Sequence, residues 1–110
     1  MKKYIVEQFV VIDKQVSSDQ EFQKYVMDRK TLVEYKHFVH NFDVQRTSQL
    51  MLNNRAMFTK WIFDNKQQAE EFVAKKESVW RDRVTSQEQV IYSYGPLQIE
   101  EAEHANPEFI

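Results

Sequence analysis

Few side chains in this 110-residue sequence have the chemistry that catalysis requires. Cysteine is absent, which excludes thiolate nucleophiles, disulfides and Cys-based zinc sites and fits a reducing compartment. A single glycine excludes a glycine-rich phosphate loop. Any catalysis would therefore depend on general acid–base groups in an apolar cavity. Histidine titrates near neutrality, so His40 is the candidate for proton transfer, and Gln8 is the candidate for polarising a bound carbonyl or phenol.

The three histidines do not fit a metal site. His37 and His40 are three residues apart on a predicted strand, so their side chains should point to opposite faces, and His104 belongs to an acidic terminal stretch. The sequence therefore predicts no bound metal and no cofactor. A half-buried sheet histidine is the simpler interpretation of His40.

Two charged residues interrupt stretches that are otherwise mainly apolar. Glu7 lies within Lys3–Ile12, and Lys60 lies within Ala56–Phe63. Burying a lone carboxylate is costly, so an ion pair between neighbouring strands is the simpler interpretation, and a catalytic acid or base is the alternative. The residues predicted to line a ligand pocket or a dimer face are Glu7, Gln8, Lys60, Trp61, Phe72 and Tyr92.

Hydrophobic periodicity predicts the strands that must position these residues. Lys3–Ile12 and Ala56–Phe63 are apolar on both parities, which is typical of central strands covered on both faces. His37–Thr47 alternates between apolar and polar residues and predicts an edge strand. Ser48–Arg55 is predicted to be a connector with a turn at its two asparagines, and Val90–Tyr94 a short last strand.

Two helices are predicted between these strands. The first covers about residues 19–35 and begins with a capping box of Ser18 and Glu21. The second is capped by Asn65, and its apolar stripe continues as far as Arg83.

The predicted order is strand, helix, strand, strand, helix, strand. Right-handed crossovers make this a ferredoxin-like α+β domain, with a four-stranded antiparallel sheet and both helices on one face. Residues 1–97 should form this domain. Residues 98–110 hold four glutamates and no Lys or Arg, and they are expected to be an acidic tail that is partly disordered or docks only at Phe109-Ile110. The other sheet face would be apolar and uncovered, which favours dimerisation or a ligand cavity.

The stretches KYIVEQFVVI and WIFDNKQQAEEFV resemble the dimeric α+β barrel superfamily, the antibiotic-biosynthesis-monooxygenase-like domains. The resemblance implies a homodimer with facing sheets and, as one activity, cofactor-independent oxygenation of a small aromatic substrate. The haem-degrading branch of the family has an asparagine on the first strand and a tryptophan and a histidine on the second helix. Gln8, Phe72 and Asp82 stand at those places here. Because Asp82 replaces the iron ligand, the resemblance does not imply haem degradation.

Three functions remain open from the sequence. The first is an interaction module that dimerises through the open sheet face, the second a monooxygenase-like enzyme acting on a small aromatic substrate, and the third a small inhibitor or regulator of another protein. Nucleic-acid binding is not expected, because the chain without its acidic end is nearly neutral and carries no basic–glycine–aromatic signature. No stretch reaches the roughly eighteen apolar residues of a membrane span, and Glu7 and Asp13 interrupt any signal-peptide core. A soluble cytoplasmic protein is expected.

Overall fold

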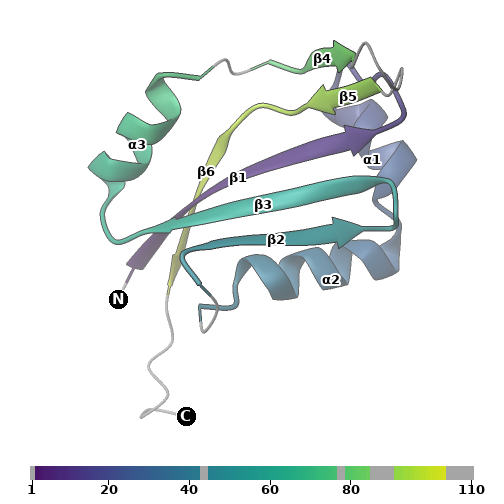
Figure 1. Cartoon of the computed structure of the whole chain (residues 1–110). Helices are drawn as coiled ribbons and strands as arrows, with labels where there is room; N and C mark the ends of the chain where they lie inside the picture. Colours follow the sequence, from purple (N-terminus) through teal and green to yellow (C-terminus); the bar gives the residue numbers. More distant parts are fainter. Residues whose placement is uncertain (1, 43–44, 77–78, 85–90, 104–110) are drawn as a thin grey trace.

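A computed structural model describes residues 2–42, 45–76, 79–84 and 91–103 of the chain. Within these residues the protein is an α+β domain whose sheet has six strands and whose helices number three (Figure 1). In chain order the elements are β1 (Lys2–Ile12), α1 (Asp19–Val26), α2 (Arg29–Val39), β2 (Thr47–Leu52), β3 (Ala56–Phe63), α3 (Lys66–Ala74), β4 (Arg81–Val84), β5 (Ile91–Tyr94) and β6 (Gln98–Glu103). None of the described helices has both the length and the apolar character that crossing a membrane requires.

The two strands predicted to be central are central. The sheet has the order β2-β3-β1-β5-β4, and β6 also pairs with β1. All these pairings are antiparallel. One edge of β1 therefore pairs with β3, and the other pairs first with β6 and then with β5, which follow each other along it (Figure 1). The sheet has more strands than the four predicted.

A bulge separates β5 from β6. Two residues of β1, Gln8 and Phe9, lie opposite three residues, 95–97, because Glu7 pairs with Gln98 but Val10 pairs with Tyr94. The Gly95 backbone N–H donates to the Phe9 carbonyl at 2.7 Å. The Gln8 side chain donates through Nε2 to the Gly95 carbonyl at 3.0 Å. Gln8 therefore satisfies a backbone group that the bulge leaves without a ladder partner.

Helices cover both faces of the sheet, so the prediction of two helices on one face is wrong. Helices α1 and α2 cover the face that carries Ile5 and Phe58, both fully buried. Helix α3 covers one end of the other face, where the Phe72 ring centroid lies 5.1 Å from that of Trp61 and 5.5 Å from that of Phe63. In Figure 1, α3 lies at the opposite end of the sheet from α1. Large apolar side chains on both parities of the central strands require cover on both faces.

The predicted strand His37–Thr47 is wrong. Helix α2 continues to Val39, and the second strand is β2, which lies, except for Thr47, inside the stretch predicted to be a connector. Phe38 and Phe42 share a strand parity, but Phe38 also lies three residues after Tyr35 on one face of α2, and the helix ends before Phe42. Both pack against the core beneath α1 and α2. The second strand as it is observed, β2, lies at the end of the sheet.

The turn predicted at Asn53-Asn54 is confirmed. Both residues have positive φ, 51° and 55°, and the Arg55 backbone N–H donates to the Leu52 carbonyl at 2.9 Å. Asparagine tolerates this left-handed conformation, and two such residues in succession form the turn that suits the twist of a hairpin.

The first predicted helix is two helices. Ser18 and Asn65 cap α1 and α3 as predicted, each accepting a hydrogen bond from the backbone N–H three residues on, at 3.2 and 2.9 Å. The predicted helix over residues 19–35 breaks after α1, however, because Asp28 caps a new helix by accepting from the Thr31 backbone N–H at 2.7 Å.

The second predicted helix is too long, and the predicted tail begins too early. Helix α3 ends at Ala74, and Arg81–Val84 form a strand paired with β5. The first six residues of the expected tail form β6, paired in register with Lys2–Glu7 of β1. Val90, predicted to begin the last strand, and Phe109-Ile110, predicted as the docking point of the tail, lie outside the described residues.

Candidate functional site

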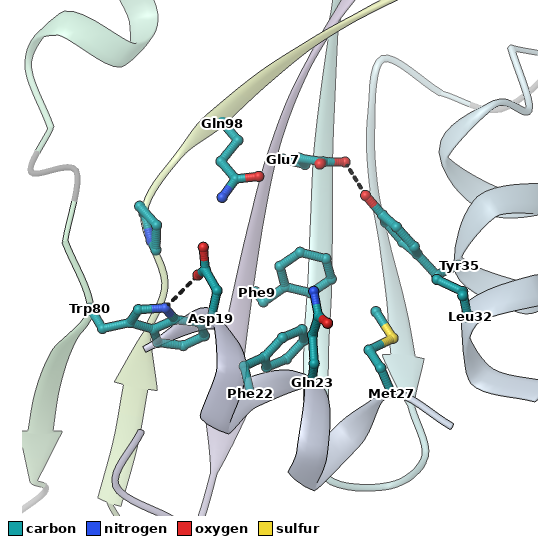
Figure 2. A pocket seen from close by; sticks show the side chains of 11 residues that line it. Glu7, Phe9, Asp19, Phe22, Gln23, Met27, Leu32, Tyr35, Trp80 and Gln98 are labelled. Carbon is teal, nitrogen blue, oxygen red and sulfur yellow. Dashed lines mark hydrogen bonds between the residues drawn. The ribbon is translucent and has the colours of Figure 1, made fainter. Parts of the chain in front are cut away.

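A cavity of about 320 Å³ lies between the sheet and the helices α1 and α2 (Figure 2). Strand β1 supplies its centre, helices α1 and α2 supply one wall, and the segments that enter β4 and β6 supply the other. Its lining consists of Glu7, Phe9, Asp19, Phe22, Gln23, Met27, Leu32, Tyr35, Trp80, Pro96 and Gln98.

Glu7 is the buried ionisable group of this cavity. Its side chain is on the face covered by α1 and α2, and the residue is only 6% exposed. The Tyr35 hydroxyl donates to Glu7 Oε2 at 2.7 Å, and Oε1 has no hydrogen-bond donor among the described residues. Burial raises the pKa of Glu7 from 4.5 to about 7; the Tyr35 bond and His40 oppose this rise, and Glu100 adds to it. The same burial, together with the Glu7 charge, raises the pKa of Tyr35 far above its ordinary range, so this hydroxyl remains a donor.

The predicted ion pair between Glu7 and Lys60 is wrong. The two residues are direct cross-strand neighbours, and both are buried on the same face. The Lys60 ammonium nevertheless donates to the carbonyls of Phe38 and, at 2.7 Å, of Asn41, at the C-terminal end of α2. Carbonyls at this end of a helix favour a cation, while burial lowers the pKa of Lys60. Lys60 thus attaches α2 to the sheet, and no described cation pairs with Glu7.

Aromatic rings form the body of the cavity. The Phe9 and Phe22 ring centroids lie 4.5 Å apart, and those of Phe22 and Trp80 lie 5.5 Å apart. The Trp80 indole N–H donates to Asp19 Oδ1 at 2.8 Å, which fixes the ring at the far end from Glu7 (Figure 2). Gln98 is the cross-strand neighbour of Glu7 on β6, so its side chain lies on the same face at the Glu7 end.

The predicted acid–base pair is not brought together. His40 lies at the end of α2 rather than on a strand, and its ring nitrogens are 2.9 Å from the Lys36 carbonyl and 3.0 Å from a Glu100 carboxylate oxygen. Gln8 follows Glu7 on β1 and therefore lies on the opposite face, where it binds the bulge. Gln8 and His40 cannot contact one substrate.

The other predicted site residues also lie away from the cavity. Trp61 and Phe72 pack against each other between β3 and α3. Tyr92 lies on the same face, in a part that α3 does not cover, with its ring 6.4 Å from that of Tyr94. Asp82, which takes the place of the family's histidine, is on β4 and not on a helix. Of the predicted pocket residues, Glu7 alone lines the cavity.

A second feature is an apolar row across the sheet, on the face that α3 only partly covers. Met51 is the cross-strand neighbour of Met57, Met57 of Val10, and Val10 of Tyr94. Met51 is 44% exposed, and the other three are half-buried. None of the described helices packs on these four residues, which we call the open row. Arg81 ends the row on β4, with its guanidinium 5.8 Å from the Tyr94 ring centroid.

Comparisons of this chain with protein-family models, with curated proteins and with solved structures found no match. What the cavity and the open row can bind follows from their own geometry.

Proposed function

We propose that this chain is a small binding module whose cavity holds a ligand with an apolar, aromatic body and a polar group directed at Glu7. The observation that carries the proposal is a carboxylate only 6% exposed, at the end of an aromatic-lined cavity, one of whose oxygens receives no hydrogen bond from the described residues. A buried carboxylate without its full set of donors costs free energy, and a ligand that donates to Oε1 would offset that cost.

The size and composition of the cavity support this function. Its volume of about 320 Å³ is near the lower limit of known ligand pockets, which enclose roughly 300–1,000 Å³. Aromatic walls with a few polar groups at defined places are the usual composition of such pockets. A titratable carboxyl group in a cleft is also a common mark of a functional site.

Binding can be tested by two-dimensional NMR with a panel of small aromatic compounds. We expect some compounds to shift the backbone amides of Glu7, Phe9 and Gln98. Replacing Gln23 at the rim by tryptophan should block the cavity and abolish these shifts, whereas the control Lys24→Trp places the same ring next to Gln23 but outside the lining. Shifts that map only to the open row, or equal shifts in both variants, would contradict binding in this cavity.

A second proposed property is self-association through the open row. Four apolar side chains that continue across four strands form a surface that a second copy could cover. Because Trp61 and Phe63 already pack against α3, only the part of the sheet beyond this helix is available for a facing sheet. The resemblance to dimeric α+β barrels is therefore proposed for this part of the face alone.

Light scattering tests self-association directly. We expect a dimer at micromolar concentration and a folded monomer for Val10→Asp. The control Val33→Asp places the same charge on α2, where Val33 is 63% exposed, and should remain dimeric. A monomeric wild-type protein would exclude this role for the open row.

A further inference from the structure

Among the described residues, the charges that line the cavity are all of one sign. These residues supply two carboxylates, Glu7 and Asp19, and no Lys, Arg or His. The remaining polar groups are the amides of Gln23 and Gln98, the Tyr35 hydroxyl, which already donates to Glu7, and the Trp80 indole N–H, which already donates to Asp19. An anionic ligand would meet two carboxylates and no cation, so the electrostatics disfavour anions and favour positive charge.

The aromatic rings connect the two carboxylates. Ring centroids lie 5.3 Å apart from Tyr35 to Phe9, 4.5 Å from Phe9 to Phe22 and 5.5 Å from Phe22 to Trp80. Figure 2 shows this row of four rings, with Glu7 hydrogen-bonded at the Tyr35 end and Asp19 hydrogen-bonded at the Trp80 end. Ring faces attract cations as well as apolar groups, and the attraction strengthens where water is excluded.

We infer that the cavity selects an organic cation, an ammonium group carried on an aromatic body. This inference rests on the proposed binding function and adds the charge of the ligand to it. The ammonium would donate to Glu7 Oε1 and to the Gln98 side-chain carbonyl, while Tyr35 continues to hold Oε2. The body of the ligand would lie along the rings of Phe9 and Phe22. The Glu7 end is preferred because Glu7 is buried, whereas Asp19 is exposed.

Affinity for such a cation should depend on pH. A cation favours the ionised form of Glu7, whose pKa is about 7 in the free protein, so binding should strengthen as pH rises through that value. The other ionisable groups around Glu7 are Tyr35 and His40 of the α2 region, Glu100 on β6, Lys60 on β3 and Asp19 on α1. The variant His40→Gln should retain most of the dependence, because His40 acts on Glu7 only through its charge.

Three probes of nearly equal shape separate charge from shape: tryptamine, its neutral alcohol analogue tryptophol, and the anion indole-3-acetate. By calorimetry at about pH 8 we expect tryptamine to bind about tenfold more tightly than tryptophol, the usual advantage of a charge-assisted hydrogen bond, and indole-3-acetate to bind weakest. Between about pH 8 and about pH 6 the affinity for tryptamine should fall roughly tenfold as Glu7 is protonated, while that for tryptophol should change little.

The variant Glu7→Gln should bind tryptamine and tryptophol about equally. Equal, pH-independent binding of the two by the wild type would overturn the choice of a cation and leave the proposed function standing. Failure of all three probes, and of the aromatic panel, would overturn both. The ranking of probes and its pH dependence require only the wild-type protein, so the test does not depend on whether the variant folds.

Discussion

Replacing Glu7 by glutamine should stabilise this protein at alkaline pH and change its stability little at acid pH. Glutamine has nearly the same shape, and its carbonyl oxygen can still accept the Tyr35 hydrogen bond. What the substitution removes is the charge that Glu7 acquires as it ionises inside the cavity. Glu7 is 6% exposed, so solvent screens that charge poorly.

The expected size follows from the pKa of Glu7, which folding raises from 4.5 to about 7. The folded protein then binds the Glu7 proton more tightly than the unfolded chain does. The contribution of Glu7 to the free energy of unfolding is therefore complete below about pH 4.5 and is lost as pH rises through about 7. The whole loss corresponds to about 3 kcal/mol, most of which falls between about pH 5 and about pH 8.5.

Urea unfolding, followed by tryptophan fluorescence at these two pH values, measures the effect. The difference in unfolding free energy between Glu7→Gln and the wild type should increase by about 2–3 kcal/mol from the lower to the higher pH. The control Glu34→Gln removes an exposed carboxylate next to Tyr35 in sequence and should show a difference that is nearly the same at both. A pH-independent difference for Glu7→Gln would refute the raised pKa and the burial that causes it.

Three further predictions concern the framework of the cavity. Lys60→Met should destabilise the protein by about 2–4 kcal/mol, because two helix-end carbonyls lose a charged donor; Lys66→Met, at an exposed site, should cost little, and equal unfolding midpoints would contradict this role. Gly95→Ala should cost about 1–3 kcal/mol in thermal unfolding, because its new Cβ would lie 3.1 Å from a backbone oxygen of β1 and from an indole ring; an unchanged melting temperature would show that the bulge adapts. Truncation after Leu97 removes all of β6 and should abolish the cooperative transition, whereas truncation after Glu103 keeps the strand and should preserve it; cooperative melting of the shorter chain would mean that β6 is dispensable.

The interior strands were predictable because the residue pattern that identifies each of them lies within the strand itself. Lys3–Ile12 and Ala56–Phe63 carry large apolar side chains on both parities, and this pattern is typical of a strand with cover on both faces. The same observation bears on the helices. If both faces of the central strands need cover, two helices on one face cannot supply it, and the Trp61 and Phe63 side chains required α3 on the other face.

The wrong predictions concern segments whose residue spacing fits both a helix and a strand. In these segments, contacts with residues far away in sequence decide which of the two forms. Phe38 has the strand parity of Phe42, but it also lies three residues after Tyr35 on one face of α2. Val79 and Trp80 continue the helical stripe of α3, yet Trp80 packs against Phe22 of α1, and the residues after it pair with β5. Such contacts join residues far apart in sequence, so propensity and periodicity within one segment cannot show them.

The candidate site was predictable only at its centre. Glu7 could be recognised as unusual because a lone acid interrupts an interior strand. Tyr35 reaches the cavity because α2 places it there, and Trp80 reaches it because α3 ends early. Gln98 reaches it because β6 pairs with β1. Each of these placements depends on an element whose bounds were predicted wrongly, so periodicity alone could not assemble the lining.

Glu7 and Lys60 show how differently one fold can treat two neighbouring buried charges. Lys60 donates to two carbonyls at a helix end, an arrangement that stabilises both the charge and the packing of α2. Among the described residues Glu7 has a single donor, it lines a cavity, and its ionisation costs about 3 kcal/mol in a domain whose total stability is typically about 5–15 kcal/mol. An apolar residue at this position would serve folding better, since burying a charge that lacks a partner is a local conflict. Local conflicts of this kind are expected at functional sites, where a ligand rather than the fold supplies the missing partner.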